Sequence, residues 1–238
     1  MSGHSRWSQI KHKKANTDEK RGQLFSKLGK KITIAAKNDP DPETNLKLKS
    51  VIEYAKQFNM PGENIQRAIQ RAAKKDESQL EILFLEAVGP KNINLLIQAV
   101  TDNRNRTIAE IRLILANKNF KLVPEGSIKW QFETKGFIEL TLPNNINKED
   151  LELKLIETGI DNTDFEENTF LYTKPNQLEE VKRHINELGL EIQSSGLCYI
   201  NTLPIKIKDE TEKTELINVL SILENHDDVE EVYSNVDF

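Results

Sequence analysis

Residues 81–110 read EILFLEAVGPKNINLLIQAVTDNRNRTIAE, and two apolar runs stand out in this stretch. The runs, 81–88 and 93–100, are rich in Leu, Ile and Val, and they flank the turn sequence Gly89-Pro90-Lys91-Asn92. Branched apolar runs of this length separated by Gly and Pro are typical of two neighbouring strands. The stretch therefore predicts two strands joined by a short connection.

A helix is expected directly after these strands. Thr107 and Glu110 have the spacing of a capping box, in which the two side chains bond the first free amides of a helix. Apolar residues within 108–115 follow helical spacing, and a third strand is expected at 121–123 or at 127–130. The segment is thus predicted to be β-β-α-β.

Residues 131–200 are predicted to form a self-contained ferredoxin-like unit, because their order is β-α-β-β-α-β. The expected elements are strand 131–142, helix 148–158, strands 160–165 and 169–173, helix 177–188 and strand 191–200.

The remaining C-terminal segment is too small to bury its own apolar face. Its expected elements are strand 203–207, helix 212–224 and strand 229–233, which we predict return to complete the sheet of the middle domain. This topology makes the middle domain 79–130 plus 201–238, with 131–200 as an insertion.

Three amphipathic helices are predicted upstream, in a domain that covers residues 1–78. The first begins near Asp18 and ends before Asn38, the second covers 43–58, and the third starts near Glu63. The predicted fold class is α+β, with an N-terminal three-helix domain followed by two ferredoxin-like α+β domains, the last inserted into the middle one.

The composition suits a globular protein in a reducing compartment. The 238 residues are 37% hydrophobic and 30% charged, without an apolar run long enough to span a membrane or to form a secretory signal. Cys198 is the single cysteine, so no internal disulfide can form. We expect a cytoplasmic protein.

The net charge of −5 hides a division of the chain into a basic head and an acidic body. Residues 1–75 hold 17 Lys and Arg against 7 Asp and Glu, a net +10, and residues 76–238 hold 16 against 31, a net −15. A basic head of this kind favours contact with nucleic acid, which an acidic body repels.

The most basic stretch is the N-terminal arm, residues 3–14, which contains Trp7 and two histidines among four Lys and Arg. Cationic side chains neutralise phosphates and an aromatic ring stacks on a base. The alternative is a solvated tail, which is the usual role of a charge run.

Basic residues also lie away from the apolar stripes of two predicted helices and in the loop that follows the second strand of the middle domain. On the first helix, Lys20, Lys27, Lys30, Lys31 and Lys37 lie opposite the apolar stripe, which is also typical of a solvated face. The loop Asn103–Arg106 offers guanidinium groups for phosphate, or else forms a local turn whose arginines pair with surface acids. The candidate nucleic-acid-binding residues are Arg6, Trp7, Lys11, His12, Lys13, Lys14, Lys20, Arg21, Lys27, Lys31, Arg67, Arg71, Lys74, Arg104 and Arg106.

Catalytic and metal-binding patterns are not found in the sequence. It has no phosphate-binding Gly loop, dinucleotide turn or Gly-x-Ser-x-Gly elbow. His4 and His12 lack further ligands at metal-binding spacing, Cys198 is expected in the core, and the acids of 227–231 are interpreted as a solvated run. We expect a non-enzymatic protein without metal, cofactor or small-molecule substrate.

Several long motifs resemble the YebC family. They are Gly3-His4-Ser5-Arg6-Trp7, Ile10–Lys14, Lys20-Arg21-Gly22, Phe25–Leu28, Asn59-Met60-Pro61, Asn64–Ile69, Thr101–Thr107, Gly126-Ser127 and Lys135-Gly136. The chain departs from the family pattern at 87–92, where a glycine-rich turn with tyrosine is usual, and at 118–121, where a glycine pair is usual.

The resemblance implies a three-domain cytoplasmic DNA-binding transcriptional regulator. Related mitochondrial proteins are translational activators, and a ribosome-associated role has been proposed for bacterial members. The expected partner is therefore DNA or, alternatively, ribosomal RNA and the ribosome, since both functions need only phosphate-binding charge.

Overall fold

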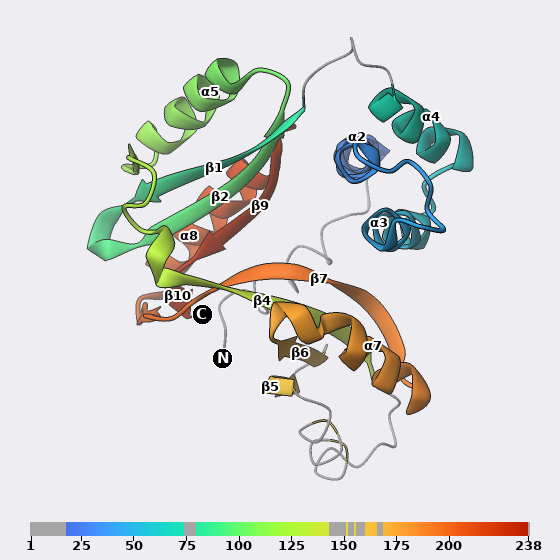
Figure 1. Cartoon of the computed structure of the whole chain (residues 1–238). Helices are drawn as coiled ribbons and strands as arrows, with labels where there is room; N and C mark the ends of the chain where they lie inside the picture. The colour runs from blue at the N-terminus through green and yellow to red at the C-terminus, as the bar shows by residue number, and fades with distance from the viewer. Residues whose placement is uncertain are drawn as a thin grey trace. The chain divides into compact units, whose positions relative to one another are not determined.

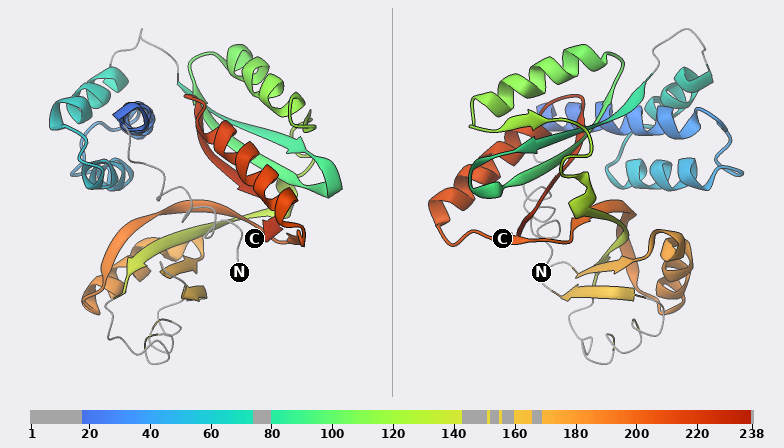
Figure 2. Two further views of the ribbon diagram at one scale, coloured as in Figure 1. Left: turned by 180° about the vertical axis from the view of Figure 1, so that it is seen from behind. Right: turned by 60° about the vertical axis from the view of Figure 1, so that its left-hand side comes forward.

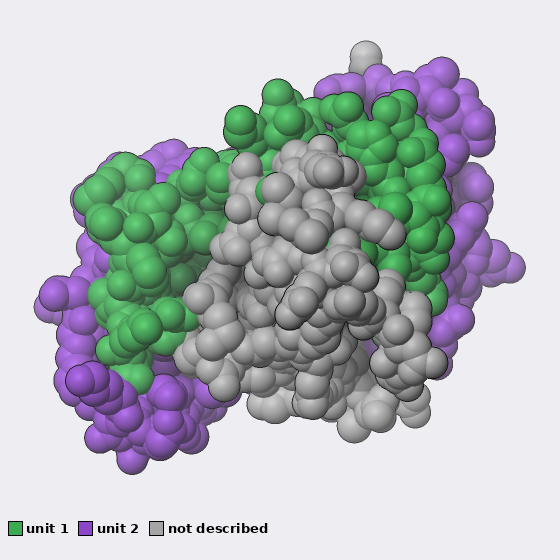
Figure 3. Space-filling view, turned by 90° about the horizontal axis from the view of Figure 1, so that it is seen from below, with its two compact units in different colours: residues 1–12, 130–207, 233–238 green, residues 13–129, 208–232 purple. Residues whose placement is uncertain are grey.

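The computed structural model describes residues 18–73, 80–142, 151, 155, 160–165 and 169–237, with the backbone alone at 18–20, 73 and 161–165. The described residues divide into two compact units (Figure 3). One unit contains 18–129 and 208–232, and the other contains 130–207 and 233–237. None of the described helices is both long and apolar enough to cross a membrane.

The three predicted N-terminal helices are present and pack around one apolar core. They are α2 (Asp18–Ala36), α3 (Leu46–Gln57) and α4 (Gly62–Ala73). Each contributes apolar residues at helical spacing, and Ile32, Leu48 and Ala55 have no exposed surface. The second helix begins three residues later than predicted, because the Asn45 side chain caps it by accepting a hydrogen bond from the Leu48 amide at 3.0 Å.

The middle sheet has the strand order β3-β1-β2-β9. Its strands are β1 (Glu81–Val88), β2 (Asn94–Thr101), β3 (Lys121–Val123) and β9 (Val229–Ser234). The helices α5 (Arg104–Ala116) and α8 (Glu210–Glu224) lie beside each other against it (Figures 1 and 2). The predicted return of the C-terminal strand is confirmed, since β9 is next to β2.

The buried carboxylate of Glu86 decides between the two predicted positions of the third strand. Its oxygens accept hydrogen bonds from the backbone amides of Gly126, Ile128 and Lys129 at 2.6–3.0 Å. Those amides are thus bound to a side chain instead of a neighbouring strand, and the strand forms at 121–123.

Left-handed backbone occurs at both places where the chain departs from the family pattern. Lys91 and Asn92 have φ values of 55° and 61°, and Asn119 has φ of 60°. Glycine adopts this conformation most easily, but asparagine tolerates it. The turns therefore keep a conformation suited to glycine although other residues occupy them.

The second unit has the ferredoxin-like strand order β5-β6-β4-β7. Its elements are β4 (Phe132–Thr141), β5 (Ile160–Phe165), β6 (Thr169–Thr173), α7 (Leu178–Glu187) and β7 (Glu191–Asn201). Of the predicted helix 148–158 the structure describes Leu151 and Leu155, both helical and buried, and the rest lies outside the described residues. Cys198 is buried in β7, as predicted.

One predicted strand of the C-terminal segment is placed differently. The expected strand 203–207 is shortened to β8 (Ile205–Lys206), which pairs in parallel with β10 (Val236–Asp237) instead of joining the middle sheet. The local apolar pattern specifies an extended segment but not its neighbour. The fold is α+β, with three helices followed by two α+β domains, one inserted into the other. The exact domain limits proposed from the sequence stay a prediction.

Candidate nucleic-acid interface

Only part of the predicted interface falls within the described residues. The arm residues Arg6, Trp7, Lys11, His12, Lys13 and Lys14 lie outside them, as does Lys74. Lys20 is described by its backbone alone, within α2. The side chains that can be placed are those of Arg21, Lys27, Lys31, Arg67, Arg71, Arg104 and Arg106.

Three of these arginines are exposed on the helical domain. Arg67 and Arg71 are one turn apart on α4, so their side chains are neighbours on the helix surface, and neither makes an ion pair with another described residue. Arg21 is exposed on α2, with its guanidinium 5.4 Å from the centre of the Phe25 ring. These guanidinium groups are available to phosphate.

The lysines of α2 are instead held by oxygen atoms of the C-terminal segment. The Lys27 ammonium donates to the carbonyl oxygen of Glu224. Lys31 Nζ lies 3.3 Å from Glu230 Oε2 and 3.6 Å from Glu231 Oε1. This side of α2 therefore faces acidic groups and is not the simple solvated face that its sequence suggests.

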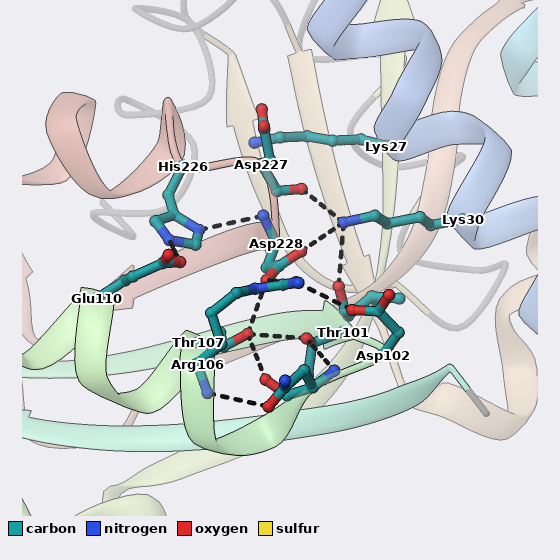
Figure 4. A network of polar contacts seen from close by, with 12 residues as sticks. Lys27, Lys30, Thr101, Asp102, Arg106, Thr107, Glu110, His226, Asp227 and Asp228 are labelled. Carbon is teal, nitrogen blue, oxygen red and sulfur yellow. Dashed lines mark hydrogen bonds and ion pairs between the residues drawn. The ribbon is translucent and has the colours of Figure 1, made fainter. Parts of the chain in front are cut away.

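Lys30 makes three hydrogen bonds through its ammonium group (Figure 4). Its ammonium donates to Asp228 Oδ1 at 2.6 Å, to the Asp227 carbonyl oxygen at 3.0 Å and to the Val100 carbonyl oxygen at 3.3 Å. An ammonium group has three protons, so all of its donors have acceptors.

Asp228, at the end of the α8–β9 connection, is the centre of this polar network (Figure 4). Its side chain is only 6% exposed, and Oδ2 accepts from Arg106 Nη2 at 3.0 Å and from the Thr107 hydroxyl at 2.7 Å. Burial by itself raises the pKa of Asp228, but hydrogen bonds from Lys30, Thr107 and Arg106 outweigh it and hold that pKa well below its ordinary value. The sequence-based interpretation of residues 227–231 as a solvated run is wrong for Asp228 and Glu230, which are 4% exposed.

The Asn/Arg loop makes mostly local contacts. Asn103 caps α5 by accepting from the Arg106 amide at 3.1 Å, so the helix begins at Arg104 and the predicted capping box at Thr107 is wrong. Arg106 Nη2 also bonds Asp102 at 3.0 Å, and the Arg106 pKa is raised by its hydrogen bond to Asp228. Arg104 is half exposed, with Nη1 3.9 Å from a Glu81 oxygen, too far for a hydrogen bond.

Thr107 links this loop to the network through a chain of hydroxyl groups. Its buried hydroxyl lies 2.8 Å from Thr101 Oγ1, which accepts from the Asn103 amide at 2.9 Å. A carboxylate only accepts, so Thr107 gives its proton to Asp228 and the Thr101 hydroxyl donates to Thr107. Each donor in this series of hydrogen bonds, from the Asn103 amide to the Thr107 hydroxyl, therefore has an acceptor.

We expect Thr107→Val to lower the free energy of unfolding by about 2 kcal/mol, because the isosteric change removes an acceptor from Thr101 and a donor from Asp228 inside the protein. Urea unfolding followed by circular dichroism measures this loss. Thr214→Val is the matched control, since among the described residues the exposed Thr214 hydroxyl bonds only the Glu210 carbonyl of its own helix. Equal losses in the two variants would contradict the role assigned to Thr107.

His226 also belongs to the network. His226 Nδ1 accepts from the Asp228 amide at 3.1 Å, so Nε2 carries the proton of the neutral ring and donates to Glu110 Oε2 at 3.0 Å. Ligand atoms of Glu110, His226 and Asp228 lie within 4.8 Å of one another. A metal ion there would have to displace Lys30 or Arg106 from Asp228, so the arrangement is better suited to internal hydrogen bonding.

Comparison with known proteins identifies the family. A family profile described as the TACO1/YebC protein N-terminal domain matches residues 5–75, and one described as the TACO1/YebC second and third domain matches residues 80–236. The chain belongs to the TACO1/YebC family. The resemblance drawn from the sequence motifs is thereby confirmed.

Relatives in this family match over essentially their whole length. A protein of Halothermothrix orenii is 39% identical, over 100% of this chain and 95% of its own, and one of Caldanaerobacter subterraneus is 41% identical, over 100% and 98%. Both are named "Probable transcriptional regulatory protein". The crystal structure of a conserved hypothetical protein from Aquifex aeolicus, 37% identical, superposes with a TM-score of 0.89 over 98% of this chain and 96% of that one.

Proposed function

We propose that this protein is a non-enzymatic, cytoplasmic regulator of gene expression that binds DNA. The observation that carries the proposal is the net charge of +10 on residues 1–75 beside −15 on the rest of the chain. Such a head attracts a polyanion, and the acidic body keeps the rest of the protein away from it. The names of the TACO1/YebC relatives support a role in transcription.

The proposed contact surface consists of the N-terminal arm together with the exposed arginines of the helical domain. Arg67 and Arg71 lie side by side on α4, and Arg21 is exposed on α2. The proposal keeps Lys20, Lys74 and Arg104 as further candidate contacts. Arginine and lysine bound to phosphates set the position of a protein on a duplex but do not read its sequence.

The polar network does not suggest catalysis. Asp228 uses its oxygens for Lys30, Arg106 and Thr107, and His226 uses both ring nitrogens for internal hydrogen bonds. These groups stabilise the fold, and the proposal needs no cofactor or small-molecule substrate.

Electrophoretic mobility shifts across a salt series test the proposal. We expect the affinity for duplex DNA to fall by about 10³-fold between 50 and 200 mM salt, because each neutralised phosphate contributes a slope of about −0.9 in log affinity against log salt. A promoter duplex that binds more tightly than a random duplex of equal length supports specific regulation. Equal binding of the two duplexes would limit the function to non-specific contact, and no binding would overturn the proposal.

Binding to ribosomal RNA is the second candidate, and the arm favours it. Trp7 stands among basic residues in a segment of the kind that stacks on unpaired bases of folded RNA. Sedimentation of the full chain with ribosomes at physiological salt, lost on deletion of residues 1–14, is the result expected for this function. Protein that stays at the top of the gradient excludes it.

A further inference from the structure

Three lysines on one side of α2 have the geometry of a phosphate-binding surface. Lys27, Lys30 and Lys31 are separated by three and four residues, so their side chains leave the helix on the same side. In the structure their ammonium groups meet carboxylate and carbonyl oxygens of residues 224–231. These are the anionic and polar oxygens that a phosphate backbone also offers to lysine.

The two carboxylates that face these lysines differ in how completely their oxygens are hydrogen-bonded. At Lys30 every ammonium proton has an acceptor, and the Asp228 carboxylate has three donors. Lys31 lies near Glu230 and Glu231, and the Glu230 side chain is 1% exposed with an Oε1 that has no hydrogen-bond partner among the described residues. A buried carboxylate with a partner for one of its two oxygens has lost its hydration without full compensation. The Glu230 carboxylate is therefore less completely compensated than the Asp228 carboxylate.

We propose that Lys27, Lys30 and Lys31 form a second binding surface for the nucleic-acid backbone, which residues 224–231 cover in the free protein. Phosphates compete with the acidic residues for the three ammonium groups, beginning at Lys31. There the hydration that Glu230 regains on release into water offsets part of the free energy needed to break its contact with Lys31. The inference rests on the proposed function, because it assigns a further surface and its control to the same nucleic-acid partner.

Covering this surface lowers the apparent affinity for nucleic acid. If the uncovered state is a minor fraction of the free protein, the apparent dissociation constant of that surface rises by the inverse of that fraction. Removing the competing charges should thus strengthen binding beyond what a change in net charge alone produces.

The test compares two double variants with the same change in charge. Glu230→Gln with Glu231→Gln removes the acids opposite Lys31, while Glu210→Gln with Glu212→Gln removes acids of α8 that pair with Lys213 and Lys91. Fluorescence anisotropy with a random-sequence duplex DNA across a salt series measures both. We expect the first variant to bind about fivefold or more tightly than the second, with a salt slope steeper by about one to two.

A third substitution identifies the lysine that gains the contact. Lys31→Gln should abolish the gain in the Glu230→Gln, Glu231→Gln background and have little effect in the unaltered chain, where Lys31 is covered. Glu231→Gln alone is the milder variant, since Glu231 is 30% exposed and its change leaves the buried residues in place. It should give a smaller gain in the same direction.

The outcomes separate this inference from the proposed function. Equal affinity and slope in the two double variants, with the unaltered chain binding DNA, overturn the covered surface and leave the proposed function standing. Failure of the unaltered chain and of both double variants to bind overturns both. Binding that appears only in the Glu230→Gln, Glu231→Gln variant supports the covered surface but contradicts the proposed function, which requires the unaltered chain to bind.

Discussion

Asp228→Asn is expected to lower the free energy of unfolding at pH 7 by about 3 kcal/mol, because it removes the charge that holds Lys30 and Arg106 together inside the network. The asparagine amide has one oxygen and one NH₂ group. Whichever way it turns, the NH₂ group faces a donor, either Lys30 on one side or Arg106 and Thr107 on the other. The loss is smaller than for two fully buried partners, because water reaches the 45% exposed Arg106 side chain.

Asp227→Asn is the matched control for this measurement. Asp227 is the neighbouring residue, is exposed, and contributes to Lys30 through its backbone carbonyl, which the substitution keeps. Urea unfolding of the two variants should differ by most of the expected loss. Similar stabilities of the two variants would show that the Asp228 carboxylate is not the centre of the network.

The stability difference between the unaltered chain and Asp228→Asn should also depend on pH. The folded-state pKa of Asp228 lies below its ordinary value of 3.8, so the stabilisation is complete above about pH 5 and is lost as pH falls through 3.8 towards the folded-state pKa. The unfolding curves of the two proteins should therefore converge between about pH 4 and pH 2. A difference that stays constant over this range would contradict a depressed pKa.

The largest effect on nucleic-acid binding is expected from the arm. Changing Arg6, Lys11, Lys13 and Lys14 together to alanine should weaken DNA binding by about 100-fold or more and reduce the salt slope by about 3 to 4, because four phosphate contacts are lost. The thermal unfolding temperature should not change, since a short polar segment adds little apolar burial to the core. Fluorescence anisotropy at several salt concentrations measures both quantities.

A control variant separates the position of these charges from their number. Lys121, Lys174, Lys206 and Lys208 are exposed lysines of the acidic body, and their replacement by alanine changes the net charge by the same amount. We expect this control to leave the salt slope unchanged. If the arm variant binds DNA as tightly as the control variant, the arm is a solvated tail and not a binding segment.

Much of the fold was predictable because its signals are local. The helical spacing of apolar residues in α2, α3 and α4 and the strand-helix order of residues 131–200 lie within short windows of sequence. The errors of the sequence-based prediction occur where the hydrogen bonds of one side chain decide between two possible starting points of an element. Asn103, not Thr107, caps α5, and the Thr107 hydroxyl is bonded to Asp228 instead.

Two different constraints act on the backbone in the turns at residues 87–92 and 118–121. At Gly89 a Cβ atom would come within 2.3 Å of the Phe120 ring, so this close approach requires glycine. At Lys91, Asn92 and Asn119 only the positive φ is needed, and other residues supply it at a modest conformational cost. The steric contact at Gly89 thus restricts the residue type more strictly than the positive φ at Lys91, Asn92 and Asn119.

The amino-acid sequence alone determined the α+β class, the family, the helical and strand periodicities and the division into a basic head and an acidic body. Only the tertiary structure decided which charges face solvent, since Lys30 and Asp228 are 198 residues apart and meet through the folding of α2 against the α8–β9 connection. The physical reason is that a run of charged residues has no periodicity from which its ion-pair partners could be predicted. Its burial depends on whether distant oxygens and ammonium groups together compensate the loss of water, and that compensation exists only in three dimensions.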